Sequence, residues 1–145
     1  MADERTDALA IAVLWLALVV GMVLHFNYDM SGLRYGVSVE LPGADGTVPW
    51  SNFVIKALFY VVPFLLAVIA SSFPGPAYRP VNFVLSLLFF LANASHVVVT
   101  ALRASDVITR AQVLLLVAVL IANGQLGRIS YRWWRSTKSA GGYLR

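Results

Sequence analysis

The chain of 145 residues contains no cysteine, which excludes a small disulfide-stapled fold. Charged residues are also scarce, at 12% of the sequence against about 25% in soluble domains. Apolar residues make up 59%, and the mean hydropathy is +0.76. This composition excludes disordered and collagen-like chains, and it predicts a single integral membrane domain over residues 1–145.

Recognised catalytic motifs are lacking as well. The sequence has no Walker loop, no dinucleotide fingerprint, no nucleophile elbow and no zinc-protease helix. Acidic residues are missing from the interiors of the long apolar stretches, unlike in most proton-coupled pumps. We therefore expect a protein that is not an enzyme.

Four apolar stretches are present, at about residues 8–26, 52–71, 81–102 and 106–127. Each has the roughly 20 residues that a helix needs to cross a hydrocarbon core about 30 Å thick. The alternating pattern of a membrane barrel is absent, so helices are expected. The predicted fold class is an all-α integral membrane protein, with four transmembrane helices in a bundle.

Orientation follows from the distribution of lysine and arginine. An even number of spans puts both termini on one side, together with the turn at residues 72–80. That side holds seven of the eleven Lys and Arg residues and the other side holds four. Because positive residues resist translocation, both termini are predicted to be cytoplasmic. The membrane is expected to be a bacterial inner membrane or a plasma membrane.

The connections between the spans differ in length. The turn at 72–80 contains three prolines, and the link at 103–105 is very short, so the second, third and fourth spans should be sequential neighbours. Pro63 should kink the second span. Gly124 to Gly127 should end the fourth helix. The outer loop, residues 27–51, alternates over Leu33–Leu41 and predicts a short β-strand in a small cap.

Polar residues follow one face of the third span. Asn82, Ser86, Asn93, His96 and Thr100 are spaced by 4, 7, 3 and 4 residues, which places them on one side of a helix. These side chains either join the helices by hydrogen bonds or line a polar pathway for a transported ligand. Both interpretations remain open at the level of sequence.

The two histidines are the candidate cofactor ligands. His25 lies late in the first span and His96 late in the third, so helix geometry puts them at nearly the same depth. They would hold a b-type haem or contribute to a metal site, for which Asp29 is the nearest carboxylate. Alternatively, both are ordinary hydrogen-bonded residues, and no cofactor is required.

A polar cluster is predicted near the outer face. Lys56 enters at the start of the second span, where its ammonium either reaches the interface or pairs with Asp29 beside the two histidines. Asn93 and Thr100 are further candidates for this ligand site. An anionic headgroup, a quinone or a proton would suit such a cluster.

The tail at 128–145 is basic and aromatic. Arg128, Arg132, Trp133, Trp134 and Arg135 directly follow a span, which favours anchoring at the membrane surface and not nucleic-acid binding. Docking of a cytoplasmic protein on the two tryptophans is the alternative.

The function expected from these features is that of a non-catalytic subunit or accessory factor of a larger membrane complex. Its partners would be lipids and other membrane subunits, or a second copy of itself. Two alternatives stay open: a haem- or quinone-binding electron-transfer subunit, and a small transporter or channel with a polar path along the third span.

Overall fold

The computed structural model describes residues 2–38, 40, 43–104 and 107–141, and almost all of them are helical. The elements in chain order are α1 (Ala2–Ser31), the 3₁₀ helix η1 (Gly32–Tyr35), α2 (Trp50–Lys56), the π-helical turn η2 (Ala57–Val61), α3 (Val62–Ser72), α4 (Tyr78–Arg103) and α5 (Val107–Gly141). Because α2, η2 and α3 follow one another without a break, the chain forms four long helical rods. All four are long and apolar enough to cross a membrane, which confirms the all-helical class.

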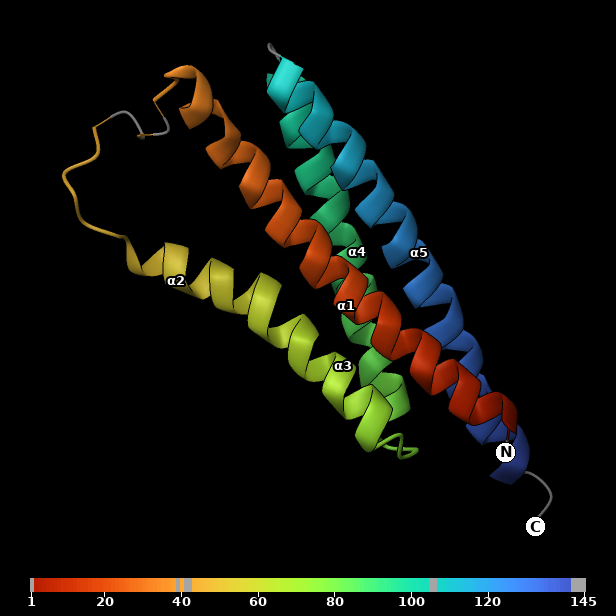
Figure 1. Cartoon of the computed structure of the whole chain (residues 1–145). Helices are drawn as coiled ribbons and strands as arrows, with labels where there is room; N and C mark the ends of the chain where they lie inside the picture. The colour runs from red at the N-terminus through yellow and green to blue at the C-terminus, as the bar shows by residue number, and fades with distance from the viewer. Residues whose placement is uncertain (1, 39, 41–42, 105–106, 142–145) are drawn as a thin grey trace.

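The rods form a bundle in which α1 packs against both α3 and α5, and α4 packs against α5. The N-terminus, the end of α5 and the connection between α3 and α4 lie together at one end, here called the termini end (Figure 1). The opposite end, with the connections that follow α1 and α4, is called the loop end. The second rod thus packs mainly on α1 and not on α4, its expected neighbour.

The core is concentrated toward the termini end. Trp15 and Leu18 of α1 are fully buried with Ala70 of α3 and with Leu126 and Trp133 of α5. The Trp15 ring meets the Phe89 ring of α4 edge to face, with centroids 5.2 Å apart. The bundle is therefore packed most closely at the level of α3, and less closely at the level of α2.

The second rod loses its contacts toward the loop end. Pro63 has no backbone N–H, and its ring crowds the carbonyl four residues earlier, that of Phe59. The disruption takes the form of the π turn η2, which ends at Val61, two residues before the proline. On the loop-end side of this turn, α2 contains no buried residue, and in Figure 1 α2 runs well apart from α1.

The predicted outer strand is not found. Gly32–Tyr35 form a 3₁₀ helix, which Gly36 ends with a positive φ of 75°, and the Val37 N–H bonds back to the Gly32 carbonyl. The described residues contain no second strand that could complete a ladder, and these local bonds satisfy the backbone instead. Residues 39, 41 and 42 of the predicted strand lie outside the described residues.

The glycine-rich segment does not end the fourth helix. α5 continues through Gly124 and Gly127 as far as Gly141. A Cβ on Gly127 would lie 3.8 Å from Ser86 Oγ, which is ordinary van der Waals contact, so α4 packs against α5 at this glycine without requiring it. Leu126, Ser130 and Trp133 continue one buried face at helical spacing, and this packing maintains the helix where the sequence predicted its end.

Candidate functional site

Asn82 is the centre of a buried hydrogen-bond network in the termini half. Its Oδ1 accepts from Trp15 Nε1 of α1 at 2.8 Å, and its Nδ2 donates to Ser130 Oγ of α5 at 2.8 Å. The Tyr78 hydroxyl lies 3.0 Å from both Asn82 Oδ1 and the Leu66 carbonyl oxygen of α3, and it donates to one of them at a time. The Asn82 amide therefore joins α4 to α1 and α5, and the neighbouring Tyr78 hydroxyl of α4 can join α4 to α3 instead.

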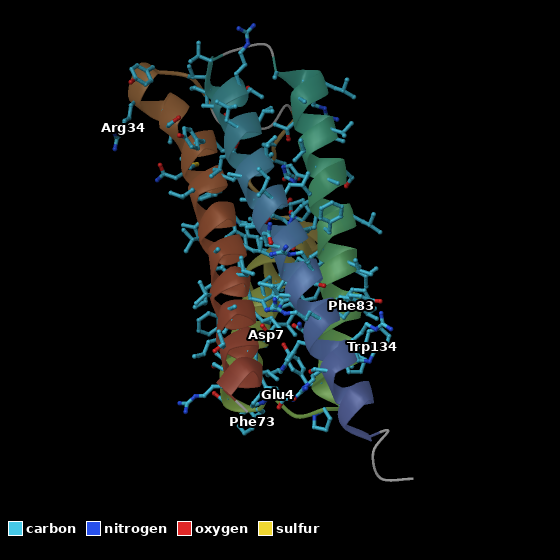
Figure 2. The ribbon with its side chains drawn as sticks, turned by 90° about the vertical axis from the view of Figure 1, so that its right-hand side faces the viewer. Glu4, Asp7, Arg34, Phe73, Phe83 and Trp134 are labelled. Atoms are coloured by element: carbon cyan, nitrogen blue, oxygen red, sulfur yellow. The ribbon has the colours of Figure 1, made fainter. Side chains whose placement is uncertain are left out.

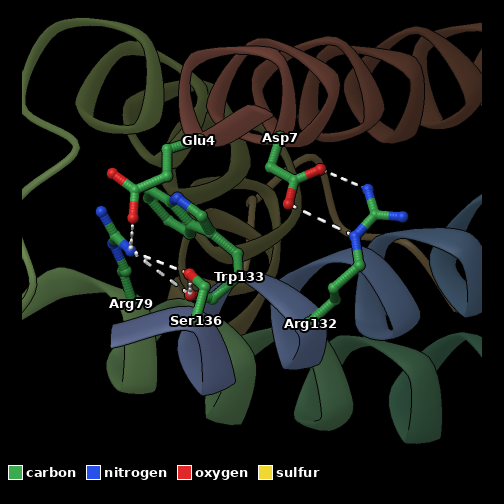
Figure 3. Close-up of polar contacts among 6 residues, drawn as sticks. All are labelled: Glu4, Asp7, Arg79, Arg132, Trp133 and Ser136. Atoms are coloured by element: carbon green, nitrogen blue, oxygen red, sulfur yellow. Dashed lines mark hydrogen bonds and ion pairs between the residues drawn. The ribbon is translucent and has the colours of Figure 1, made fainter. Parts of the chain in front are cut away.

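Arg79 occupies the termini end of α4 and is buried. Its guanidinium lies 3.1 Å from Glu4 Oε1 and 3.2 Å from Ser136 Oγ, and it packs over the Trp133 ring with 4.8 Å to the centroid (Figure 3). Arg79 also donates to the Trp133 carbonyl at 3.4 Å. These contacts hold the starts of α1 and α4 against the last turns of α5.

A second ion pair joins the same helices. Arg132 of α5 contacts the Asp7 carboxylate of α1 through two nitrogens (Figure 3). Asp7 is 7% exposed, so its charge would be costly without this partner. Two acids of α1 thus compensate two arginines at the termini end, and we assign this region to assembly of the bundle.

The predicted surface anchor divides into two groups. Trp133 is completely buried, so it contributes to the core and is not available to a membrane surface or a docking protein. Trp134 stacks on Phe83 of α4 with centroids 5.5 Å apart, and both lie on the side of the bundle in Figure 2. Arg135 bonds to the Tyr131 hydroxyl at 3.2 Å, and Arg128 is exposed. An anchoring role thus remains a prediction for the residues other than Trp133.

His25 and His96 meet in the loop half, as their depths predicted. Their rings are 4.9 Å apart between centroids and nearly perpendicular, at 84°. Metal–imidazole bonds of about 2.0–2.1 Å would put rings on opposite faces of a haem at centroids roughly 6 Å apart. The two rings contact each other, so this geometry does not fit a haem held between them.

The metal alternative needs further ligands. His25 Nδ1 is buried and makes no hydrogen bond. Asp29 lies one helical turn beyond His25, but its carboxylate accepts a hydrogen bond from Gln112 Nε2 of α5. Among the described residues, no group of three or more His, Asp or Glu side chains is placed to hold a metal ion.

Lys56 does not join this acid in an ion pair. Its ammonium lies over the Phe26 ring, 5.4 Å from the centroid. The ion pairs found in the described part of the chain are those of Arg79 and Arg132. The predicted cluster is therefore two neighbouring groups, with Asp29 bonded toward α5 and Lys56 held against α1.

Two adjoining cavities lie near Lys56, and the larger one also reaches Asp29. The first, of about 390 Å³, is almost wholly apolar and is lined by Phe26, Phe53, Lys56, Ala57, Tyr60 and Val61. The second, of about 1300 Å³, is more polar, and its walls include Asp29, Arg34, Asn52, Lys56, Thr109 and Gln112. Both open where α2 leaves the bundle, and Phe26 and Lys56 border both.

The remaining polar residues of α4 lie away from these cavities. Asn93 is buried, and its Oδ1 has no partner, as is true of both side-chain polar atoms of Asn123 on α5. Thr100 is half-buried, one turn beyond His96. The two cavities at the loop end are lined by α1, η1, α2, η2 and α5 and do not follow the predicted path along α4.

Sequence reasoning missed several of the residues that matter most. The sequence alone predicted no individual role for Glu4, Asp7, Trp15, Tyr60 or Arg79. One available signal was the chain topology: with four spans, acids before the first and arginines after the second and fourth meet at one end. The Tyr60 hydroxyl, 3.4 Å from the Met22 carbonyl oxygen, had no comparable signal.

The chain was also compared with known proteins. No family model, no curated protein and no solved structure matches it.

Proposed function

We propose that this protein is an integral membrane protein with cytoplasmic termini that acts as a non-catalytic subunit or accessory factor of a larger membrane complex. The supporting observation is the unequal assembly of the bundle. The termini half is joined by a buried amide network, two ion pairs and a core of large side chains. At the loop end, α2 has no buried residue at all.

This difference has an energetic consequence in a bilayer. Helices associate there through close packing and interhelical hydrogen bonds, because lipid tails are as apolar as leucine. α3 gains such contacts from α1, whereas α2 gains almost none from the rest of this chain. A neighbouring subunit that packs against α2 would supply them, and this is the role we propose for the second rod.

The alternative functions receive less support. A transport path along α4 would need its polar side chains to be accessible, but Asn82 is fully buried and bonded to two other helices. An electron-transfer role through haem would need the His25 and His96 rings to separate from 4.9 Å.

Photocrosslinking in intact membranes tests the proposal. A photoreactive residue replaces Val54 of α2, and a matched control replaces Leu88 of α4; both side chains are apolar and about half exposed. Position 54 should form a discrete protein adduct, either with another subunit or with a second copy, and position 88 should form none. Lipid adducts alone at both positions, with a monodisperse monomer in mild detergent, would contradict the proposal.

A further inference from the structure

We propose that the opening between α1 and α2 binds a membrane lipid with an anionic phosphate head, taken from the leaflet at the loop end. The lipid tail enters the apolar cavity, and the phosphate lies beside Lys56. This inference does not depend on the subunit role, because the isolated protein should bind the lipid.

The smaller cavity has the properties of a tail site. Its volume of about 390 Å³ falls within the roughly 300–1,000 Å³ typical of small-molecule pockets. Phe26 of α1 and Phe53 of α2 provide aromatic walls, and Ala57 leaves space between them. Among the described residues that line it, only Lys56 and Tyr60 have a polar side-chain group, and its lining surface is almost wholly apolar, so an alkyl chain would displace few hydrogen bonds there.

The larger cavity has the properties of a head site. Its lining includes two cations, Arg34 and Lys56, and one acid, Asp29. The acid is already engaged by Gln112, whereas the Lys56 ammonium has only the Phe26 ring against it among the described residues. Asn52 and Thr109 add neutral hydrogen-bonding groups. The balance of charge therefore favours an anion.

Lys56 lies close enough to the end of its rod for its ammonium to reach a lipid phosphate. It is the seventh residue of the second rod, about 9 Å from the start of that rod at 1.5 Å per residue. For a rod that starts at the outer edge of a headgroup layer about 6 Å deep, this distance puts the Lys56 backbone about 3 Å inside the hydrocarbon, and its long side chain can extend back to the phosphates. An ammonium held near this boundary can donate to a phosphate without leaving its aromatic neighbour.

The two cavities together favour a lipid over a free anion. Phe26 and Lys56 border both, so one molecule with a charged head and an apolar tail can occupy both spaces. Residues of α2, the helix without a buried residue, line both spaces.

The test uses the purified, delipidated full chain in detergent. Phosphatidylglycerol or phosphatidylcholine of equal chain length is titrated in, and native mass spectrometry counts the bound lipid. Lys56→Met removes the cation, and Arg103→Gln is the matched control, since it removes one exposed cation that borders neither cavity. Ala57→Phe fills the tail cavity. Far-UV circular dichroism confirms that each variant is folded.

Phosphatidylglycerol should bind the wild type at least fivefold more tightly than phosphatidylcholine, as expected for about one lysine near a membrane surface. Lys56→Met should abolish this preference, and Arg103→Gln should keep it. Ala57→Phe should weaken binding of both lipids at least fivefold.

Four results would overturn the inference. The first is equal binding of the two lipids by the wild type, and the second is an equal loss of the phosphatidylglycerol preference in Lys56→Met and Arg103→Gln. The third is unchanged lipid binding in Ala57→Phe, and the fourth is displacement of the lipid by millimolar inorganic phosphate. The last result would assign the site to a free anion.

Discussion

Replacing Gly21 with alanine tests the contact between α1 and α5. A Cβ built on Gly21 would lie far inside van der Waals contact of Val119 Cγ2. Valine is β-branched and stiff at χ1 in a helix, so its methyl group cannot turn away without strain. The two helices must separate, or Val119 must leave its rotamer.

The magnitude follows from two opposing effects. Overpacking a close contact costs about 1–3 kcal/mol, and exchanging glycine for alanine within a helix gains about 0.5–1 kcal/mol. Gly21→Ala should therefore lower the free energy of unfolding by about 1 kcal/mol. Gly124→Ala is the matched control, since its Cβ would meet only Phe90 at 3.8 Å, and it should be neutral or stabilising.

Unfolding in mixed micelles of mild detergent and dodecyl sulfate, followed by circular dichroism, measures both changes. Val119→Ala removes the clashing methyl group, so Gly21→Ala should be neutral or stabilising in that background. If Gly21→Ala is as stable as the wild type, or if Gly124→Ala loses as much, the close contact between α1 and α5 is wrong.

Two further predictions concern the buried network and the orientation. Asn82→Ala leaves the Trp15 donor and Ser130 without their partner and should lower the free energy of unfolding by about 1–3 kcal/mol in the same assay. The control Ser86→Ala loses only a bond within its own helix and should cost less than about 0.5 kcal/mol. Equal costs for the two variants would refute the bridging role of Asn82. Because the chain has no cysteine, single cysteines at Ala44 and Gly75 report topology in intact cells, and an impermeant reagent should label position 44 alone; labelling of position 75 alone would reverse the orientation.

The four helical rods were predictable because membrane-spanning helices depend on local composition. A run of about 20 apolar residues satisfies its own backbone within one helix, so no information about neighbours is required. The equal depth of His25 and His96 followed from the same linear geometry, and the structure brings their rings together. The strand expected over Leu33–Leu41 failed because a strand, unlike a helix, needs a pairing partner elsewhere in the chain.

The partners of the polar side chains were much less predictable. A pair between Asp29 and Lys56 was one of two alternatives left open by the sequence, but Asp29 bonds to Gln112, because α5 lies beside α1 at that level and α2 does not. Trp133 was assigned to a membrane surface from its basic neighbours, but it is buried against Arg79 and Tyr78. In both cases the sequence spacing was compatible with several neighbours.

The sequence by itself thus determined the number and the class of the long rods, but not where each helix ends, because hydropathy and the cost of an unpaired backbone act along one segment at a time. Only the tertiary structure decided that α1 lies between α3 and α5, that Asn82 joins α4 to α1 and α5, and that α2 leaves the bundle beyond Pro63. These features depend on which side chains meet across helices, and that pairing is a property of packed surfaces which no single segment contains.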